Sequence, residues 1–171
     1  MARIALSAAK LAVEQGLVAT TVDRIAEDAR VSRATFFRYF PSKECAVADG
    51  LTRPFLDPVI DALARQPSHL PAIEAILAAF DEAACTQTRE AAELTRASAT
   101  LSAWTLSHHQ RYEQTIADLI TPRLTETDAG PRLIAALVMA AVRLSVEDWL
   151  DQGGPLPQHL HRTLRSAACR Q

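Results

Sequence analysis

Apolar residues recur along this chain with the three-to-four-residue period that is typical of amphipathic helices. No segment shows the strict alternation of a half-buried strand, and the 171 residues contain only 5 glycines. The pattern therefore predicts an all-α protein with about nine to ten helices. The first helix is expected over Ile4–Gln15, with Gly16 as its stop signal.

Between Thr20 and Lys43 the pattern predicts two short helices joined by a tight turn. The first has apolar residues at the i, i+3, i+4 and i+7 positions that form one buried stripe, namely Val22, Ile25, Ala26 and Ala29. Thr20 or Thr21 can cap this helix, and Ser32 can cap the second. Only two residues then remain for the turn, so the two helices are expected to cross steeply.

The second short helix has two faces of different chemistry. Phe36 and Phe40 are four residues apart and are expected to be buried. Arg33, Ala34 and Phe37 share a neighbouring stripe. Arg33 can donate a forked pair of hydrogen bonds to guanine, Phe37 can contact a thymine methyl group, and the small Ala34 permits close approach. This stripe fits the major groove of DNA.

Phosphate contacts are expected around the same helix. Thr35, Tyr39 and Lys43 carry donors, and the helix N-terminus at Ser32 adds backbone N–H groups. The net charge of the chain is −2, but residues 1–45 carry seven Lys and Arg against five Asp and Glu. The remaining residues carry 11 against 15, so the basic character lies with the two short helices. The alternative is that the aromatic residues are core and the arginines form a solvated face.

The stretch resembles the DNA-binding domain of the TetR family of transcriptional regulators. The matching positions have fixed spacings and are Thr21, Ile25, Ala26, Val31, Ser32, Thr35, Phe37, Tyr39, Phe40, Ser42 and Lys43. With this resemblance, the predicted DNA-binding residues are Thr21, Ser32, Arg33, Ala34, Thr35, Phe37, Tyr39 and Lys43. The resemblance also implies a homodimeric repressor that leaves a palindromic double-stranded DNA operator when a small effector binds.

Two positions depart from the family pattern. The family usually has glycine in the turn where this chain has Arg30, and a positive backbone angle there is strained for arginine. The lead before Ile4 is very short, so we expect no basic N-terminal arm. Both departures favour an alternative function, a helical small-molecule-binding protein with weak or lost DNA binding.

The resemblance divides the chain into a helix-turn-helix DNA-binding domain over residues 1–48 and an effector-binding and dimerisation domain over 49–171. The W-x-x-x-G-G pattern that begins at Trp149 is similar to the branch that includes mycofactocin-system regulators. That similarity implies a lipophilic effector, such as a fatty acyl thioester.

Proline and glycine positions set the expected helices of the second domain. Pro41 and Ser42 open a helix that is expected to break near Gly50, because Pro54 and Pro58 interrupt helical hydrogen bonding. The helices expected after this break cover about residues 55–65, 71–84, 89–101, 104–124, 131–151 and 156–167.

The expected helix over residues 131–151 is apolar around most of its circumference. Such a helix needs partners on several faces. This pattern predicts a homodimer through the last two helices, whereas the alternative is a central helix in a monomeric core.

Trp104, His108 and Tyr112 are four residues apart and share one face of the preceding helix. Rings with polar tips are typical of a pocket that orients an apolar ligand, so these residues are the candidate effector site. The alternative is an ordinary packed or half-exposed helix face.

No other motif indicates chemistry. Cys45, Cys85 and Cys169 lack the spacing of a zinc site or a disulfide framework, and His159 with His161 has no further ligands. We therefore expect no metal, no cofactor and no catalytic activity. The longest apolar run is too short for a membrane span and the start lacks a signal peptide, which predicts a cytoplasmic protein without membrane contact.

Overall fold

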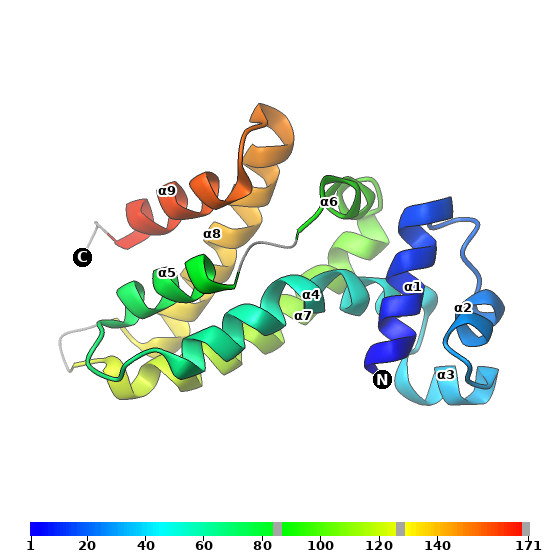
Figure 1. Cartoon of the computed structure of the whole chain (residues 1–171), viewed down its shortest axis with the longest axis horizontal. Coiled ribbons are helices and arrows are strands. Elements are labelled where there is room, and N and C mark those ends of the chain that lie inside the picture. Colours follow the sequence, from blue (N-terminus) through cyan, green and yellow to red (C-terminus); the bar gives the residue numbers. More distant parts are fainter. Residues whose placement is uncertain (84–86, 126–128, 169–171) are drawn as a thin grey trace. The chain divides into compact units, whose positions relative to one another are not determined.

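The computed structural model describes residues 1–83, 87–125 and 129–168, and all its regular elements are helical. The predicted all-α class is confirmed, with nine α-helices and a 3-10 turn in the described residues. No helix among them is long and apolar enough to cross a membrane. In chain order (Figure 1) the elements are α1 Ala2–Gln15, α2 Val22–Asp28, α3 Arg33–Tyr39, α4 Lys43–Arg65, α5 Ala72–Glu82, α6 Arg89–Arg96, α7 Ala99–Ile120, η1 Thr121–Arg123, α8 Pro131–Gln152 and α9 Leu156–Ala168.

The chain divides into two compact units. The first unit comprises Met1–Pro54 and Gln87–His108, and the second comprises Phe55–Thr86 and His109–Gln171. The first therefore contains α1 to α3, the beginning of α4, α6 and the beginning of α7. The second contains the rest of α4 and α7 together with α5, α8 and α9. The functional boundary between residues 48 and 49 stays a prediction.

The first unit is built around one apolar core. Ile4, Ile25, Phe36, Val47 and Leu101 are almost completely buried in it. Helices as short as α2 and α3 are marginal on their own, so this shared core is what stabilises them. The predicted stripe of α2 is confirmed, since its apolar residues are buried or half-buried.

Side-chain caps fix the ends of the two short helices. The Thr21 hydroxyl accepts a hydrogen bond from Arg24 N at 3.3 Å, and the Ser32 hydroxyl accepts one from Thr35 N at 3.0 Å. Thr20 is buried instead, and its hydroxyl donates to Gly16 O at 2.9 Å. The sequence therefore predicted both helix starts correctly, with Thr21 rather than Thr20 as the first cap.

The predicted break near Gly50 is wrong, because α4 runs without interruption from Lys43 to Arg65. Gly50 is a point of close helix contact: a Cβ atom there would lie 2.0 Å from the Ala5 carbonyl oxygen of α1. Pro54 and Pro58 each remove one backbone donor from α4. The helix continues through them because its apolar residues remain buried, Leu56 and Leu63 among them.

A second boundary also differs from the prediction. One helix was expected over residues 89–101 and the next from residue 104, but α6 ends at Arg96 and α7 begins at Ala99. Ser98 explains the difference, because its hydroxyl accepts a hydrogen bond from Leu101 N at 3.2 Å and caps α7. The remaining predicted helices agree with the structure to within a few residues.

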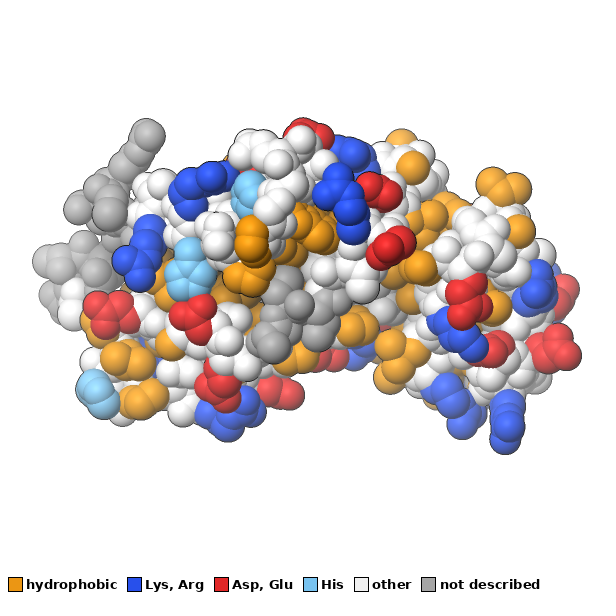
Figure 2. Space-filling view, turned by 45° about the horizontal axis from the view of Figure 1, so that its top comes forward, with side chains coloured by type: hydrophobic (Ala, Val, Ile, Leu, Met, Phe, Trp, Pro, Cys, Tyr) orange, Lys and Arg blue, Asp and Glu red, His pale blue; other side chains and the backbone are white. Residues whose placement is uncertain are grey.

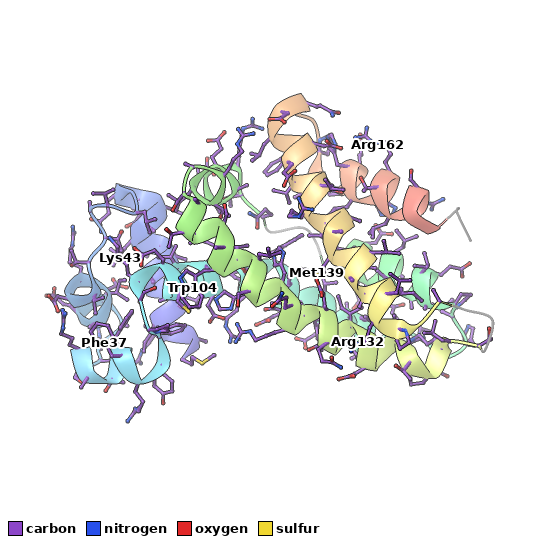
Figure 3. The ribbon with its side chains drawn as sticks, turned by 180° about the vertical axis from the view of Figure 1, so that it is seen from behind. Phe37, Lys43, Trp104, Arg132, Met139 and Arg162 are labelled. Atoms are coloured by element: carbon purple, nitrogen blue, oxygen red, sulfur yellow. The ribbon has the colours of Figure 1, made fainter. Side chains whose placement is uncertain are left out.

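In the second unit α9 packs along α8 and against α5. Gly153 and Gly154, with φ of 73° and 80°, form the turn that returns the chain from α8 to α9. Leu156, Leu160 and Leu164 form the buried stripe of α9. Met139, labelled in Figure 3, lies at the buried centre of α8.

Candidate nucleic-acid interface

The exposed side of α3 carries the predicted base-reading residues. Phe36 and Phe40 are buried, whereas Arg33, Ala34 and Phe37 are exposed together, with Phe37 retaining 46% of its surface. The Phe37 ring meets the Phe36 ring edge to face, with centroids 5.3 Å apart. An aromatic side chain that packs against the core and still exposes nearly half of its surface indicates a contact site.

Arg33 is held by two neighbours. Its Nη1 donates to the Asp23 Oδ1 of α2 at 2.6 Å, and its guanidinium carbon lies 5.2 Å from the centre of the Phe37 ring. The Arg33 and Asp23 side chains remain 60% and 73% exposed. The sequence identified Arg33 but missed Asp23, because the contact crosses the turn between α2 and α3.

A second exposed pair lies at the end of α3. The Arg38 guanidinium carbon is 5.0 Å from the centre of the Tyr39 ring, and Tyr39 is 44% exposed. Charges of both signs lie over the first unit on the face seen in Figure 2. Arg33 itself pairs with the acidic Asp23, so the basic residues of α3 do not form an uninterrupted positive field.

The predicted phosphate-binding hydroxyls lie at helix starts. Thr21 and Ser32 accept backbone hydrogen bonds as caps, and the Ser32 and Thr35 hydroxyl oxygens are 2.9 Å apart. Ser32 is exposed and Thr35 is half-buried. A capping hydroxyl accepts through a lone pair and keeps its own proton. One proton of the Ser32–Thr35 pair is used in the bond between the two hydroxyls, and the other can be donated to a phosphate.

Lys43, labelled in Figure 3, makes two hydrogen bonds that the sequence did not indicate. Its Nζ donates to Leu17 O at 2.7 Å and to Thr20 O at 2.8 Å. An ammonium has three donors, so one remains for another acceptor. The two bonds show that Lys43 fixes the connection between α1 and α2, and its phosphate contact stays a prediction.

Arg30 adopts a φ of 52° in the turn, a value that favours glycine. Backbone bonds from Arg30 N to Glu27 O at 3.0 Å and from Val31 N to Ala26 O at 2.9 Å close the turn around it. The positive φ agrees with the backbone strain that the sequence predicted at Arg30.

The three candidate effector residues make contacts within the chain and fall in different units. Trp104 is half-buried against the core of the first unit (Figure 3), and His108 is buried with Nε2 3.3 Å from Cys45 O and Nδ1 3.7 Å from Asp49 Oδ1. Tyr112 belongs to the second unit, and its hydroxyl donates to Asp57 Oδ1 at 2.5 Å. Their shared role in a pocket stays a prediction.

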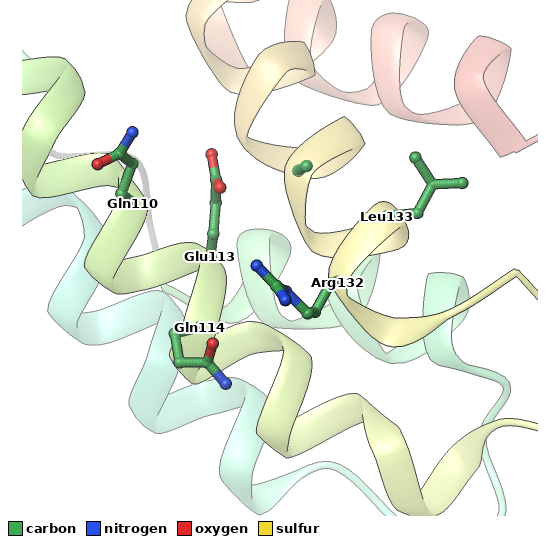
Figure 4. A pocket seen from close by; sticks show the side chains of 6 residues that line it. Gln110, Glu113, Gln114, Arg132 and Leu133 are labelled. Carbon is green, nitrogen blue, oxygen red and sulfur yellow. The ribbon is translucent and has the colours of Figure 1, made fainter.

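The second unit has an open polar pocket of about 480 Å³ that the sequence did not indicate. Figure 4 shows Gln110, Glu113 and Gln114 of α7 on one side of it and Arg132 with Leu133 of α8 on the other. Polar residues at i, i+3 and i+4 of a helix ordinarily mark a solvated face, so no sequence signal distinguishes this pocket.

The candidate metal and redox residues are engaged or lie outside the described part. Cys45 is buried as a thiol, whereas Cys85 and Cys169 lie outside the described residues. His159 Nε2 is 2.8 Å from Gly153 O, and His161 contacts Asp81. No group of three or more potential ligands is placed to hold a metal within residues 1–83, 87–125 and 129–168.

Two family models match the chain. Residues 4–45 match the model described as bacterial regulatory proteins, tetR family. Residues 67–170 match the model described as the MftR C-terminal domain. Among curated proteins, none matches the chain.

Solved structures show the same fold. The chain is similar to Thermus thermophilus FadR, described as a TetR-family transcriptional repressor in complex with lauroyl-CoA, with 22% identity and a TM-score of 0.62 over 97% of this chain and 92% of that one. It is also similar to a TetR-family regulator from Rhodococcus sp., with 18% identity and a TM-score of 0.61 over 98% of this chain and 95% of that one. These likenesses establish the architecture and leave the ligand to be inferred.

Proposed function

We propose, from the premise that this chain belongs to the tetR family of bacterial regulatory proteins and carries an MftR-type C-terminal domain, that it is a homodimeric repressor released from a palindromic operator by a lipophilic effector. As a member of this family it is a transcriptional regulator and not an enzyme. We assign DNA binding to residues 1–48, and effector binding and dimerisation to residues 49–171.

The observation that carries the proposal is the division of α3 into two faces. Phe36 and Phe40 anchor the helix in the core, which leaves Arg33, Ala34 and Phe37 exposed on one side. In a major groove, Arg33 would donate to guanine and Phe37 would contact a thymine methyl group. Two copies of this helix, about 34 Å apart, would read the two halves of a palindrome.

Backbone contacts would set the register of the helix on the duplex. We assign phosphate contacts to Thr21, Ser32, Thr35, Tyr39 and Lys43. Thr21 and Ser32 are the N-caps of α2 and α3, and the first N–H groups of a helix have no acceptor within the helix, an arrangement that favours an anion.

Dimerisation would use α8 together with α9. Leu133, Leu137 and Leu144 of α8 are 56%, 42% and 44% exposed, although α9 already packs along this helix. Residues 133, 137 and 144 are spaced four and seven apart and so share one stripe. A second copy presenting the same stripe would bury it in a four-helix interface.

A lipophilic effector is supported by the MftR-type domain and by the lauroyl-CoA bound to Thermus thermophilus FadR. Trp104, His108 and Tyr112 remain the residues we propose for its recognition. To act as a switch, the effector must bind the DNA-incompetent conformation more tightly than the DNA-bound one. A coupling of about 1–3 kcal/mol would lower operator affinity about 5- to 150-fold.

Selection from a pool of random duplexes with the purified protein tests the DNA-binding part of this proposal. We expect a palindromic winner at about 100 mM salt, with affinity that falls steeply as salt rises because phosphate contacts release counterions. An absence of enrichment even at about 50 mM salt would instead favour a helical small-molecule-binding protein, for which the strained Arg30 is the supporting observation.

A further inference from the structure

The contact between Asp23 and Arg33 brings an acidic side chain into the predicted DNA-reading surface. Asp23 lies in the first turn of α2, and Arg33 is the first residue of α3. Their side chains meet across the turn, with Nη1 and Oδ1 2.6 Å apart. An acidic group at a surface that approaches phosphates is unfavourable for affinity, so its position needs a physical explanation.

We infer that Asp23 is a specificity-determining positioning residue, which holds the Arg33 guanidinium in the orientation that reads guanine. The inference rests on the proposed function, because it assumes that Arg33 faces a base. Asp23 itself would touch no base and would act only through Arg33.

Two contacts together define the orientation of the Arg33 guanidinium. The Asp23 carboxylate fixes the Nη1 end, and the Phe37 ring lies 5.2 Å from the guanidinium carbon. A long arginine side chain without such neighbours samples many rotamers, and DNA binding would have to restrict them. Because the two contacts restrict the Arg33 rotamers before DNA binds, less conformational entropy is lost when Arg33 binds a base in this orientation.

The hydrogen-bonding capacity of arginine is sufficient for both partners. A guanidinium has five N–H donors, and the 2.6 Å bond to Asp23 engages the Nη1 group. Donors remain for a forked pair of bonds to guanine O6 and N7. Adenine offers an acceptor and a donor in the same place, so an oriented guanidinium discriminates against it.

The pair is too exposed to serve mainly as a stabilising ion pair. Arg33 and Asp23 keep 60% and 73% of their side-chain surface, and ion pairs at that exposure contribute little to folding. The Asp23 charge also disfavours a nearby phosphate, so it directs Arg33 toward bases and lowers affinity for random DNA. Both effects raise the ratio of specific to nonspecific affinity.

The experiment compares Asp23→Ala and Asp23→Asn with Glu27→Ala, a control that removes the same charge from an exposed position on the same helix. Each variant is titrated against the selected operator, a random duplex and operators in which single G·C pairs are changed to A·T. Thermal unfolding shows that each variant is folded. Arg33→Ala and the Asp23→Ala/Arg33→Ala double variant complete a double-mutant cycle.

At one position of the operator, we expect Asp23→Ala to lower the preference for G·C over A·T about tenfold. Arg33→Ala should lose the preference at the same position. Glu27→Ala should keep that discrimination, and Asp23→Ala should cost nothing further once Arg33 is absent. A different result would refute the inference alone: Asp23→Ala and Asp23→Asn discriminate at least as well as the unchanged protein, while Arg33→Ala loses discrimination. Asp23 would then only compete with DNA for Arg33, and the proposed function would stand. If Arg33→Ala also retains full discrimination, the assignment of Arg33 as a base-reading residue fails, and the inference fails with it.

Discussion

Replacing Gly50 by alanine tests the contact between α1 and α4 that the first unit depends on. A Cβ atom at residue 50 would lie 2.0 Å from the Ala5 carbonyl oxygen and 2.8 Å from the Ala9 Cβ. Ordinary contacts begin at about 3.4 Å, so α1 and α4 would have to separate by more than an ångström. The obstacle is mainly backbone, which no change of rotamer can relieve.

The expected magnitude follows from two opposing terms. Forcing atoms into a packed site costs about 3 kcal/mol, at the upper end of the usual range because the clash is with a carbonyl group. Alanine is a better helix former than glycine by about 1 kcal/mol. The variant should therefore lose about 2 kcal/mol of unfolding free energy, which lowers Tm by about 4–8 °C in a chain of this length.

Urea unfolding followed by circular dichroism measures this change. Gly130→Ala is the matched control, because the space around Gly130 is open and its φ of −58° suits alanine. Adding Ala9→Gly to Gly50→Ala should not restore stability, since the Ala5 carbonyl remains in place. A Gly50→Ala protein as stable as the original would show that helix propensity outweighs the contact and would refute the reasoning.

Three further changes test separate parts of the structure. Arg30→Gly should raise the unfolding free energy by about 1 kcal/mol because it relieves the positive φ of 52°. Arg30→Ala is the control, since it removes the same charge without this gain. Equal urea midpoints for the two variants would show that Arg30 is not strained. Lys43→Met should destabilise the protein by about 1–3 kcal/mol, since two carbonyls lose a charged donor, and an unchanged midpoint would disprove that role. Leu137→Glu should convert the dimer to monomer in sedimentation at micromolar concentration, because it places a charge on the proposed interface; an unchanged sedimentation coefficient would place the interface elsewhere.

The sequence predicted what depends on local chemistry. The caps at Thr21 and Ser32 are visible because a hydroxyl bonds a backbone group only three residues away. The two faces of α3 follow from helical spacing alone, with Phe36 buried and Phe37 exposed. The TetR resemblance rested on the same residues and is confirmed by the matching family models.

The sequence did not reveal contacts between residues far apart along the chain. Gly50 looked like a helix stop, and only its approach to Ala5 shows why glycine is required there. The bonds from Lys43 to the two carbonyls of the α1–α2 connection were not predicted, because their partners lie 26 and 23 residues away along the chain. The Asp23–Arg33 bond and the pocket between α7 and α8 are likewise products of tertiary packing.

The ratio of operator affinity to random-duplex affinity, measured for Arg33→Ala/Phe37→Ala, tests the central claim most directly. Specific binding by such regulators is about 10³-fold or more tighter than nonspecific binding. The double variant should lose most of that ratio while it still binds random DNA through its phosphate contacts, and Arg89→Ala, which removes a positive charge from α6, should keep it. A folded double variant with an undiminished ratio would show that the exposed face of α3 does not read the operator.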